Sequence, residues 1–185
     1  MSGLRRGEDG FTLPELLMAI TILAIIIVPL TGSLFTGLRT ADRTASILAS
    51  SADRQRLSLY FPPDVASASA VDTAAGAWGC AGAAPAGTTN VVQLTWHEFN
   101  AAGSTPVTTL VTSFVADYRL VQVGTEWQMT RYACTAGGAA TPVDIAHHLP
   151  ASTAATVSTS GTTVALTLTD TLGTQYTVSG SRRSA

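Results

Sequence analysis

The chain has 185 residues, a formal net charge of −2 and ten basic residues, all of which are arginine. This charge balance predicts no nucleic-acid partner, because proteins that bind DNA or RNA usually present a basic face. Only 12% of the residues are charged, and alanine, threonine, serine and glycine dominate the composition. Such a surface is unusual for a cytosolic enzyme, so we expect a protein that works outside the cytoplasm.

The N-terminal region divides into a short polar segment, 1–10, and an apolar segment, 11–30, which reads FTLPELLMAITILAIIIVPL. As a helix the apolar segment is about 30 Å long, which matches the hydrocarbon core of a bilayer. Glu15 is its only charged residue. Arg5 and Arg6 precede it, and basic residues stay on the cytoplasmic side of a membrane. We therefore expect a single-pass protein with a cytoplasmic N-terminus and its remaining residues outside.

Three kinds of segment compete as explanations of this pattern. A secretory signal peptide has a shorter apolar run, in which a carboxylate near the start is unfavourable. A plain membrane anchor gives no reason for Glu15, because an acidic residue inside a membrane span is usually functional. A leader that is cut off before the apolar run accounts for both the polar segment and Glu15.

Residues 10–15, with the sequence GFTLPE, resemble the processing motif of type IV prepilins, a glycine followed by F-T-L-x-E. In that family a membrane peptidase cuts after the glycine, and the new N-terminal residue is methylated. The resemblance covers residues 1–30. It implies cleavage between Gly10 and Phe11, N-methylation of Phe11, and a role for Glu15 in assembly.

Glu15 lies about one helical turn from the N-terminus that this cleavage would create. A carboxylate in the low dielectric of a membrane needs a partner, because its desolvation is costly. The resemblance implies that it pairs with an N-terminal amine in the filament, and the alternative is a side chain that reaches the membrane surface. Pro14 is compatible with the first helical turn, where backbone N–H groups have no acceptor within the helix.

Pro29 and Gly32 predict a weak point in the long helix. Pro29 removes one backbone hydrogen bond and crowds the carbonyl group of Ile25, and Gly32 lowers the helix propensity nearby. Two outcomes remain open. One is a simple kink where the helix leaves the membrane, and the other is a segment that loses helix and stretches in an assembled filament, as the resemblance to pilins implies.

The helix pattern resumes after Gly37. Apolar residues recur every three or four positions and form one stripe, which comprises Leu34, Leu38, Ala41, Ala45, Leu48 and Ala52. The helix is expected to end before Pro62-Pro63. We therefore predict a leader over 1–10 and a helix over 11–60, of which 11–30 span the membrane and the amphipathic second half lies on a head domain.

Residues 61–185 are predicted to form an extracytoplasmic, β-rich head. Residues 64–90 are rich in small residues and proline and are expected to form a loop. Strands are predicted at 91–99, 109–123 and 127–134, with a hairpin turn at 124–126, and a last hairpin at 162–169 and 174–179. The expected fold class is α+β, with a long N-terminal helix packed on an antiparallel β-sheet, as the resemblance to pilins implies.

Cys80 and Cys134 are the two cysteines of the chain. They do not resemble a zinc site, which needs four ligands in close pairs. In an exported protein they favour one disulfide, which adds about 3–4 kcal/mol of stability in the chain-entropy model. Two buried free thiols are the alternative.

A second resemblance lies in the predicted hairpin. Residues 115–131 follow the pattern V-x-D-Y-x-L-x-x-x-G-x-x-W-x-x-x-R, which is similar to a segment of W-type minor pilins and J-type pseudopilins. The matching positions are Tyr118, Leu120, Gly124 and Arg131. A generic head with two β-hairpins is the alternative interpretation.

The sequence contains no pattern that is typical of catalysis. His97 and Glu98 are adjacent in a predicted strand and would point to opposite faces, and His147-His148 is placed in a predicted loop. No H-x-x-x-H spacing, phosphate-binding glycine loop or nucleophile elbow occurs. We therefore expect no enzyme activity, no cofactor and no metal site.

Two classes of function follow. The resemblance implies a structural subunit, and a minor one, of a type IV pilus or a type II secretion pseudopilus. Its partners would be other pilin or pseudopilin subunits, the prepilin peptidase and the inner-membrane assembly platform. It would be stored in the inner membrane and then enter a cell-surface or periplasmic filament. The second class is a membrane-anchored binding or adhesion module that enters no filament.

Overall fold

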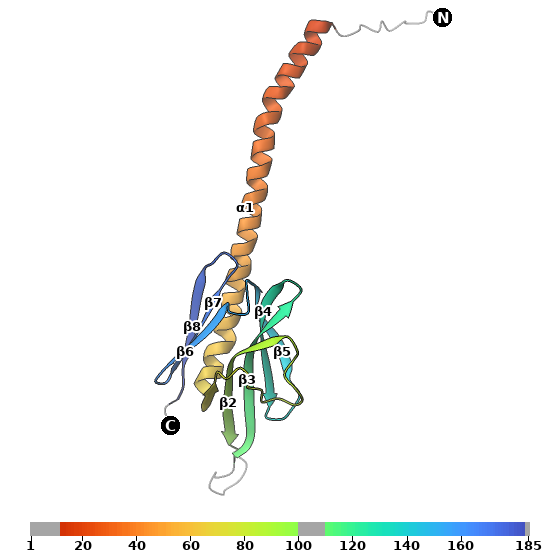
Figure 1. The fold of residues 1–185 in the computed structure, drawn as a ribbon. Helices are drawn as coiled ribbons and strands as arrows, with labels where there is room; N and C mark the ends of the chain where they lie inside the picture. Colours follow the sequence, from red (N-terminus) through yellow and green to blue (C-terminus); the bar gives the residue numbers. More distant parts are fainter. Residues whose placement is uncertain (1–11, 100–109, 184–185) are drawn as a thin grey trace, which may run out of the picture. The chain divides into compact units, whose positions relative to one another are not determined.

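The computed structural model describes residues 12–99 and 110–183, which contain one helix and eight strands. The elements are α1 (Leu13–Ser67), β1 (Ala70–Asp72), β2 (Thr88–Phe99), β3 (Leu110–Val123), β4 (Glu126–Thr135), β5 (Thr141–Leu149), β6 (Ala155–Ser160), β7 (Thr163–Thr169) and β8 (Gln175–Ser181) (Figure 1). A long apolar helix followed by antiparallel strands confirms the predicted α+β class. The chain divides into two compact units, 1–47 and 48–185.

The described part of the first unit consists of α1, whose side chains up to Ala45 are all exposed. By length and composition α1 is able to cross a membrane. The helix continues through Pro29 and Gly32. The Ser33 hydroxyl donates to the Pro29 carbonyl at 2.9 Å, and the Thr36 hydroxyl donates to the Gly32 carbonyl at 2.9 Å. These bonds satisfy polar groups inside an apolar helix. The predicted kink or opening at this point stays a prediction.

In the second unit α1 extends to Ser67, so the predicted end before Pro62-Pro63 is wrong. Each proline costs a backbone hydrogen bond. The turns around them are nevertheless held by packing, because Leu57, Phe61 and Val65 are fully buried on one face of the helix. Burial of this face outweighs the local preference of proline to end a helix.

Two antiparallel sheets lie against the last turns of α1 (Figure 1). The first has the strand order β1-β2-β3-β4-β5, and the second has the order β6-β7-β8. β3 and β4 form the predicted hairpin, in which Val123 pairs with Glu126 across the turn. Gly124 has a φ of 64°, a left-handed conformation that glycine adopts at little cost.

Three strands were not expected from the sequence. Residues 64–90, predicted as a loop, include the end of α1, β1 and the start of β2. His147 and His148, also predicted in a loop, lie in β5, and β6 precedes the predicted last hairpin. β1 is only three residues long, and β5 pairs with β4 through two register shifts, so neither shows a regular alternation of apolar and polar residues.

The core of the second unit fills the space between α1 and the two sheets. Phe61 packs edge-on against Tyr118, with ring centroids 5.5 Å apart. The three-stranded sheet buries Val164, Leu166 and Leu168 of β7. β8 approaches the helix closely at Gly180, where an added Cβ would lie 3.1 Å from the Cα of Pro62. Both sheets are therefore packed against the helix.

A buried ion pair joins α1 to the five-stranded sheet. Arg131 of β4 donates from Nε to Asp64 Oδ2 at 2.6 Å and from Nη2 to Asp64 Oδ1 at 2.9 Å. Tyr118 of β3 donates its hydroxyl to Asp64 Oδ2 at 2.7 Å. The Arg131 guanidinium also lies over the Tyr60 ring, 5.4 Å from its centroid. One carboxylate of the helix is therefore bound by two neighbouring strands.

The protonation states of this cluster are fixed by its surroundings. Burial, and then the negative charge of Asp64, raise the pKa of Tyr118 well above its usual value, so its hydroxyl keeps the proton that it donates. Burial alone would lower the pKa of Arg131, but the hydrogen bonds and charge of Asp64 outweigh it, and the pKa is raised. Arg131 therefore stays charged and Tyr118 stays neutral at neutral pH.

We predict that Arg131→Met destabilises the fold by about 3–5 kcal/mol, because it leaves the Asp64 carboxylate buried without its cation. The double variant Asp64→Asn/Arg131→Met removes both charges and is expected to recover part of that loss. Thermal unfolding of the full chain in detergent, followed by near-UV circular dichroism, measures both. Arg183→Met, at an exposed position, is the control. Equal melting temperatures for Arg131→Met and the control would contradict the prediction.

Candidate processing and assembly site

The helix begins two residues after the predicted cleavage site. Gly10 and Phe11 lie outside the described residues, and α1 starts at Leu13. The Thr12 carbonyl accepts hydrogen bonds from the backbone N–H groups of Glu15 at 3.0 Å and of Leu16 at 3.1 Å. Thr12 therefore closes the first turn, and Glu15 lies within it.

The electrostatics of this turn suit an acidic residue. The positive end of the helix dipole stabilises a carboxylate in the first turn. Pro14 has no N–H group, and at this position none is needed, as the sequence predicts. The Glu15 side chain is exposed, and no side chain of residues 12–99 and 110–183 forms an ion pair with it. A cation from outside the chain would be able to reach this carboxylate.

The exposed surface of α1 is apolar well beyond the first turn. Exposed fractions are 62% for Leu34, 64% for Leu48 and 66% for Leu59. Within the second unit, Leu48, Ala52, Leu59 and Pro63 are all exposed and recur at helical spacing. The helix does lie on the β-sheets as expected, but through another face, that of Asp53, Leu57 and Phe61. The predicted apolar stripe remains free.

The predicted disulfide is present. Cys80 is bonded to Cys134 of β4, with their Cα atoms 5.8 Å apart. The bond holds the 73–87 loop on the face of the sheet opposite the helix. There Arg119 of β3 donates from Nη1 to the Ala77 carbonyl at 2.8 Å and lies over the Trp78 ring. The loop thus covers charged residues in the middle of the sheet.

Asp117 is the acidic member of this covered group. Its side chain is fully buried, and its Oδ1 lies 3.3 Å from Nη1 of Arg119. Burial raises the pKa of Asp117 to about 6, and the positive charge of Arg119 opposes the rise without cancelling it. A carboxyl group that gains a proton near pH 6 makes this covered face sensitive to mild acid.

The adjacent histidines of β5 bind two different carboxylates. The backbone N–H of His147 donates to Asp53 Oδ2 of α1 at 2.8 Å, and its ring Nδ1 lies 3.2 Å from Asp53 Oδ1. His148 Nδ1 lies 2.5 Å from Glu126 Oε2 of β4. The sequence did not predict these pairs, because it placed both histidines in a loop. One signal was available in the sequence: Asp53 lies four residues before Leu57 and therefore shares its helix face, so an acidic side chain facing the sheets could have been expected.

His148 has an unusual backbone conformation. Its φ of 53° is the one positive value among the described non-glycine residues. This left-handed conformation costs a residue with a Cβ on the order of 1–3 kcal/mol. An ion pair at the surface returns at most about 1 kcal/mol. The His148–Glu126 contact is therefore not explained by stability alone.

The third histidine and its acidic neighbour in the sequence do not form a pair in the described part of the chain. The ring of His97 contacts the Ser113 hydroxyl at 2.8 Å, and the Glu98 side chain lies outside the described residues. Among the residues that the structure describes, no cluster of three or more His, Cys, Asp or Glu side chains is arranged to hold a metal ion.

Comparison with known families identifies the N-terminal segment. Residues 5–31 match the family model described as the prokaryotic N-terminal methylation motif. This match supports a type IV prepilin-like protein. It covers Gly10, Phe11, Glu15 and Pro29, and it does not extend to the β-sheets. No curated protein and no solved structure shows significant similarity to the chain. The similarity of the hairpin to W-type pilins and J-type pseudopilins stays a prediction.

We predict that Asp117 makes stability fall as pH rises from about 4 to about 6.5. The pKa of Asp117 is raised in the folded state, so the fold binds this proton more tightly than the unfolded chain does. The stabilisation is present at low pH and is lost as pH passes through about 6. The change is roughly 2–3 kcal/mol.

Asp117→Asn should remove this part of the pH dependence, and chemical denaturation of the full chain in detergent between pH 4 and 7 measures it. Asp144→Asn alters an exposed carboxylate on β5, which is separated from β3 by β4, and is the control. An unchanged pH profile in Asp117→Asn would show that another group is responsible.

Proposed function

We propose that this protein is a structural subunit, and a minor one, of a type IV pilus or type II secretion pseudopilus. The observation that carries the proposal is an exposed apolar helix, α1, whose first turns lie within the residues that match the methylation motif. A prepilin-like segment implies processing by a prepilin peptidase and assembly with other pilin-like subunits. The inner-membrane assembly platform would transfer the subunit from the membrane, head outside, into the filament.

The proposed mechanism starts with cleavage between Gly10 and Phe11. Cleavage releases the leader and creates a positively charged amine on Phe11, which is then methylated. The amine would lie about one turn from Glu15, whose carboxylate is exposed in the first turn of α1. In the apolar interior of a filament, each Glu15 would be stabilised by the amine of a neighbouring subunit, since an unpaired charge there is costly. This pairing would set the stagger between subunits.

The rest of α1 would supply the adhesive surface. Leu48, Ala52 and Leu59 face away from the β-sheets and are exposed, although burying apolar side chains is favourable. A row of exposed apolar side chains along a helix is suited to packing against a second helix. The β-sheets leave this row uncovered because they bind the opposite face through Asp53, Leu57 and Phe61. One helix can thus hold its own head and contact a neighbour.

The mature N-terminus is the first test. Intact-mass and peptide mass spectrometry of the protein purified from its own host is expected to find N-methylated Phe11 and no trace of residues 1–10. The Gly10→Ala variant should keep its leader, because the peptidase no longer recognises the cleavage site. An intact Met1, or a cut beyond Leu30, would favour the membrane-anchored binding module instead.

The second test concerns Glu15. Glu15→Gln keeps the size and polarity of the side chain but removes its charge, and we expect filament incorporation to fall at least tenfold, which corresponds to roughly 1.4 kcal/mol. Incorporation is measured by immunoblotting of sheared filaments from cells that lack the wild-type chain. Asp42→Asn, an exposed carboxylate later in α1, is the control. If Glu15→Gln enters filaments as well as the control does, the pairing is refuted.

A further inference from the structure

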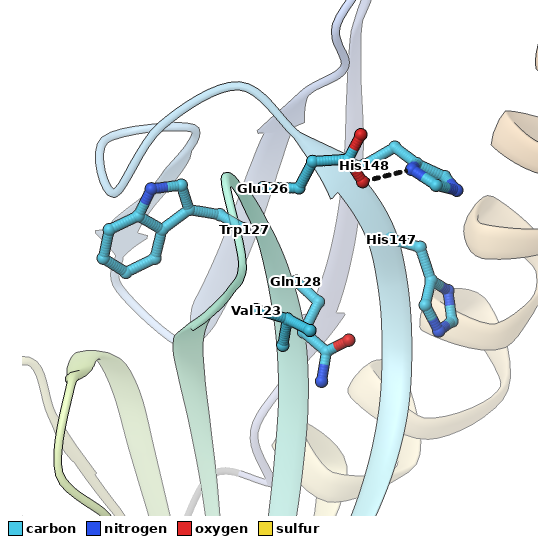
Figure 2. A pocket seen from close by; sticks show the side chains of 6 residues that line it. All are labelled: Val123, Glu126, Trp127, Gln128, His147 and His148. Atoms are coloured by element: carbon cyan, nitrogen blue, oxygen red, sulfur yellow. Dashed lines mark hydrogen bonds and ion pairs between the residues drawn. The ribbon is translucent and has the colours of Figure 1, made fainter.

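A pocket opens where the β3–β4 hairpin meets the end of β5 (Figure 2). Its volume is about 190 Å³. Val123 and Gln128 line its middle, the Glu126–His148 pair lies at one side, and His147 lies near α1 (Figure 2). Trp127 points away from the other lining side chains (Figure 2). The pocket therefore presents one carboxylate beside apolar and amide groups.

Glu126 differs from the other acidic side chains described in the second unit. Asp64 and Asp117 are bound by the arginines Arg131 and Arg119, and Asp53 accepts a backbone N–H group. The carboxylates of Asp72 and Asp170 also accept backbone N–H groups, and Asp144 accepts from Thr130. Among the residues that the structure describes, the Glu126 carboxylate forms a hydrogen bond or ion pair only with His148, and both side chains are more than half exposed. Its carboxylate is available to a partner.

The strained backbone of His148 supports a functional role for the Glu126–His148 pair. Its left-handed φ holds an exposed imidazole against an exposed carboxylate. Strained residues of this kind concentrate at sites that clamp ligands, where they fix the position of a group before it binds. Here the group that is fixed is the Glu126 carboxylate at the rim of the pocket. Such an arrangement fits a cationic ligand with a short apolar stem.

The chain itself carries suitable cations. It has no lysine, so any basic side chain of a second copy is an arginine. Arg39 and Arg43 are both exposed, and neither forms an ion pair within the part of the chain that the structure describes. They are four residues apart and therefore share one face of α1. They lie C-terminal to the apolar segment 11–30. In a filament, the head of a neighbouring subunit would be able to contact this part of α1.

We propose that the Glu126 pocket of one copy binds the arginine pair Arg39 and Arg43 on α1 of a second copy. The guanidinium group donates in its plane to a carboxylate, and its stem packs against Val123. The contact would add a head-to-helix link to the helix-to-helix contacts of the filament. This inference rests on the proposed function, because the two copies meet in an assembly held by Glu15 and the apolar face of α1.

Charge reversal tests the contact in cells that lack the wild-type chain. Glu126→Arg is expected to reduce filament incorporation roughly tenfold, because like charges then face each other across the interface. The double variant Arg39→Glu/Arg43→Glu should do the same. Combining all three changes should restore incorporation to within about twofold of the wild type. Gln175→Arg and Arg183→Glu change the charge at exposed positions elsewhere and are expected to have no effect.

Cross-linking tests the proximity directly. The chain's two native cysteines are joined in a buried disulfide, so cysteines introduced as Glu126→Cys and Arg43→Cys supply the free thiols. Oxidation of filaments or membranes should yield dimers and larger ladders on non-reducing gels. The pair Gln175→Cys/Arg43→Cys should remain monomeric.

The outcomes separate this inference from the proposed function. If filaments form but Glu126→Arg is harmless, or the reciprocal charges fail to restore incorporation, the pocket contact is wrong and the proposed function stands. If no 126–43 cross-link forms in filaments that contain the chain, the contact is likewise refuted. If the wild-type chain keeps its leader and enters no filament, the proposed function fails and this inference fails with it.

Discussion

The buried ion pair between Asp64 and Arg131 is the interaction on which the rest of the second unit depends. It fixes the rotation of α1 about its axis, because a bidentate contact with one carboxylate permits only a narrow range of orientations. Tyr118 binds the same carboxylate from the neighbouring strand, which ties two strands to one point of the helix. The cost of burying the charges is offset by these three hydrogen bonds. As a result of the ion pair, the same face of α1 always packs against the sheets.

Fixing this rotation decides which residues remain exposed. With Leu57, Phe61 and Val65 turned toward the core, the apolar residues Leu48 and Leu59 face outward. An exposed apolar row would be a liability in a monomer that stays free in water. It becomes an advantage in a membrane-anchored chain that packs against similar helices. One face of α1 thus packs against the sheets of the second unit, and the other face is free for the proposed assembly with neighbouring subunits.

The face of the five-stranded sheet that points away from α1 is covered in a different way. A loop covers it, held by the Cys80–Cys134 disulfide and by hydrogen bonds from Arg119. The charged residues beneath the loop are neutralised within the chain, whereas Glu126 at the hairpin is left exposed. The buried charges are therefore compensated within the unit, and the exposed charge at its edge is the one that the proposed contact with a second copy uses.

The sequence by itself determined that the chain begins with a long apolar helix, α1, that is able to cross a membrane. The apolar run, Gly10, Phe11 and Glu15 form a short linear pattern, and a helix that crosses a membrane satisfies its own backbone without help from distant residues. The sequence also predicted the β3–β4 hairpin, since Gly124 marks the turn locally, and the disulfide, since only two cysteines exist. Tertiary structure alone decided the end of α1, the place of His147 and His148 in β5, and the partner of Asp64. These depend on residues such as Asp64 and Arg131, which are 67 positions apart and meet only when the core forms. Local preference, including that of Pro62-Pro63 to end a helix, was overridden there by the burial of Phe61 and Val65.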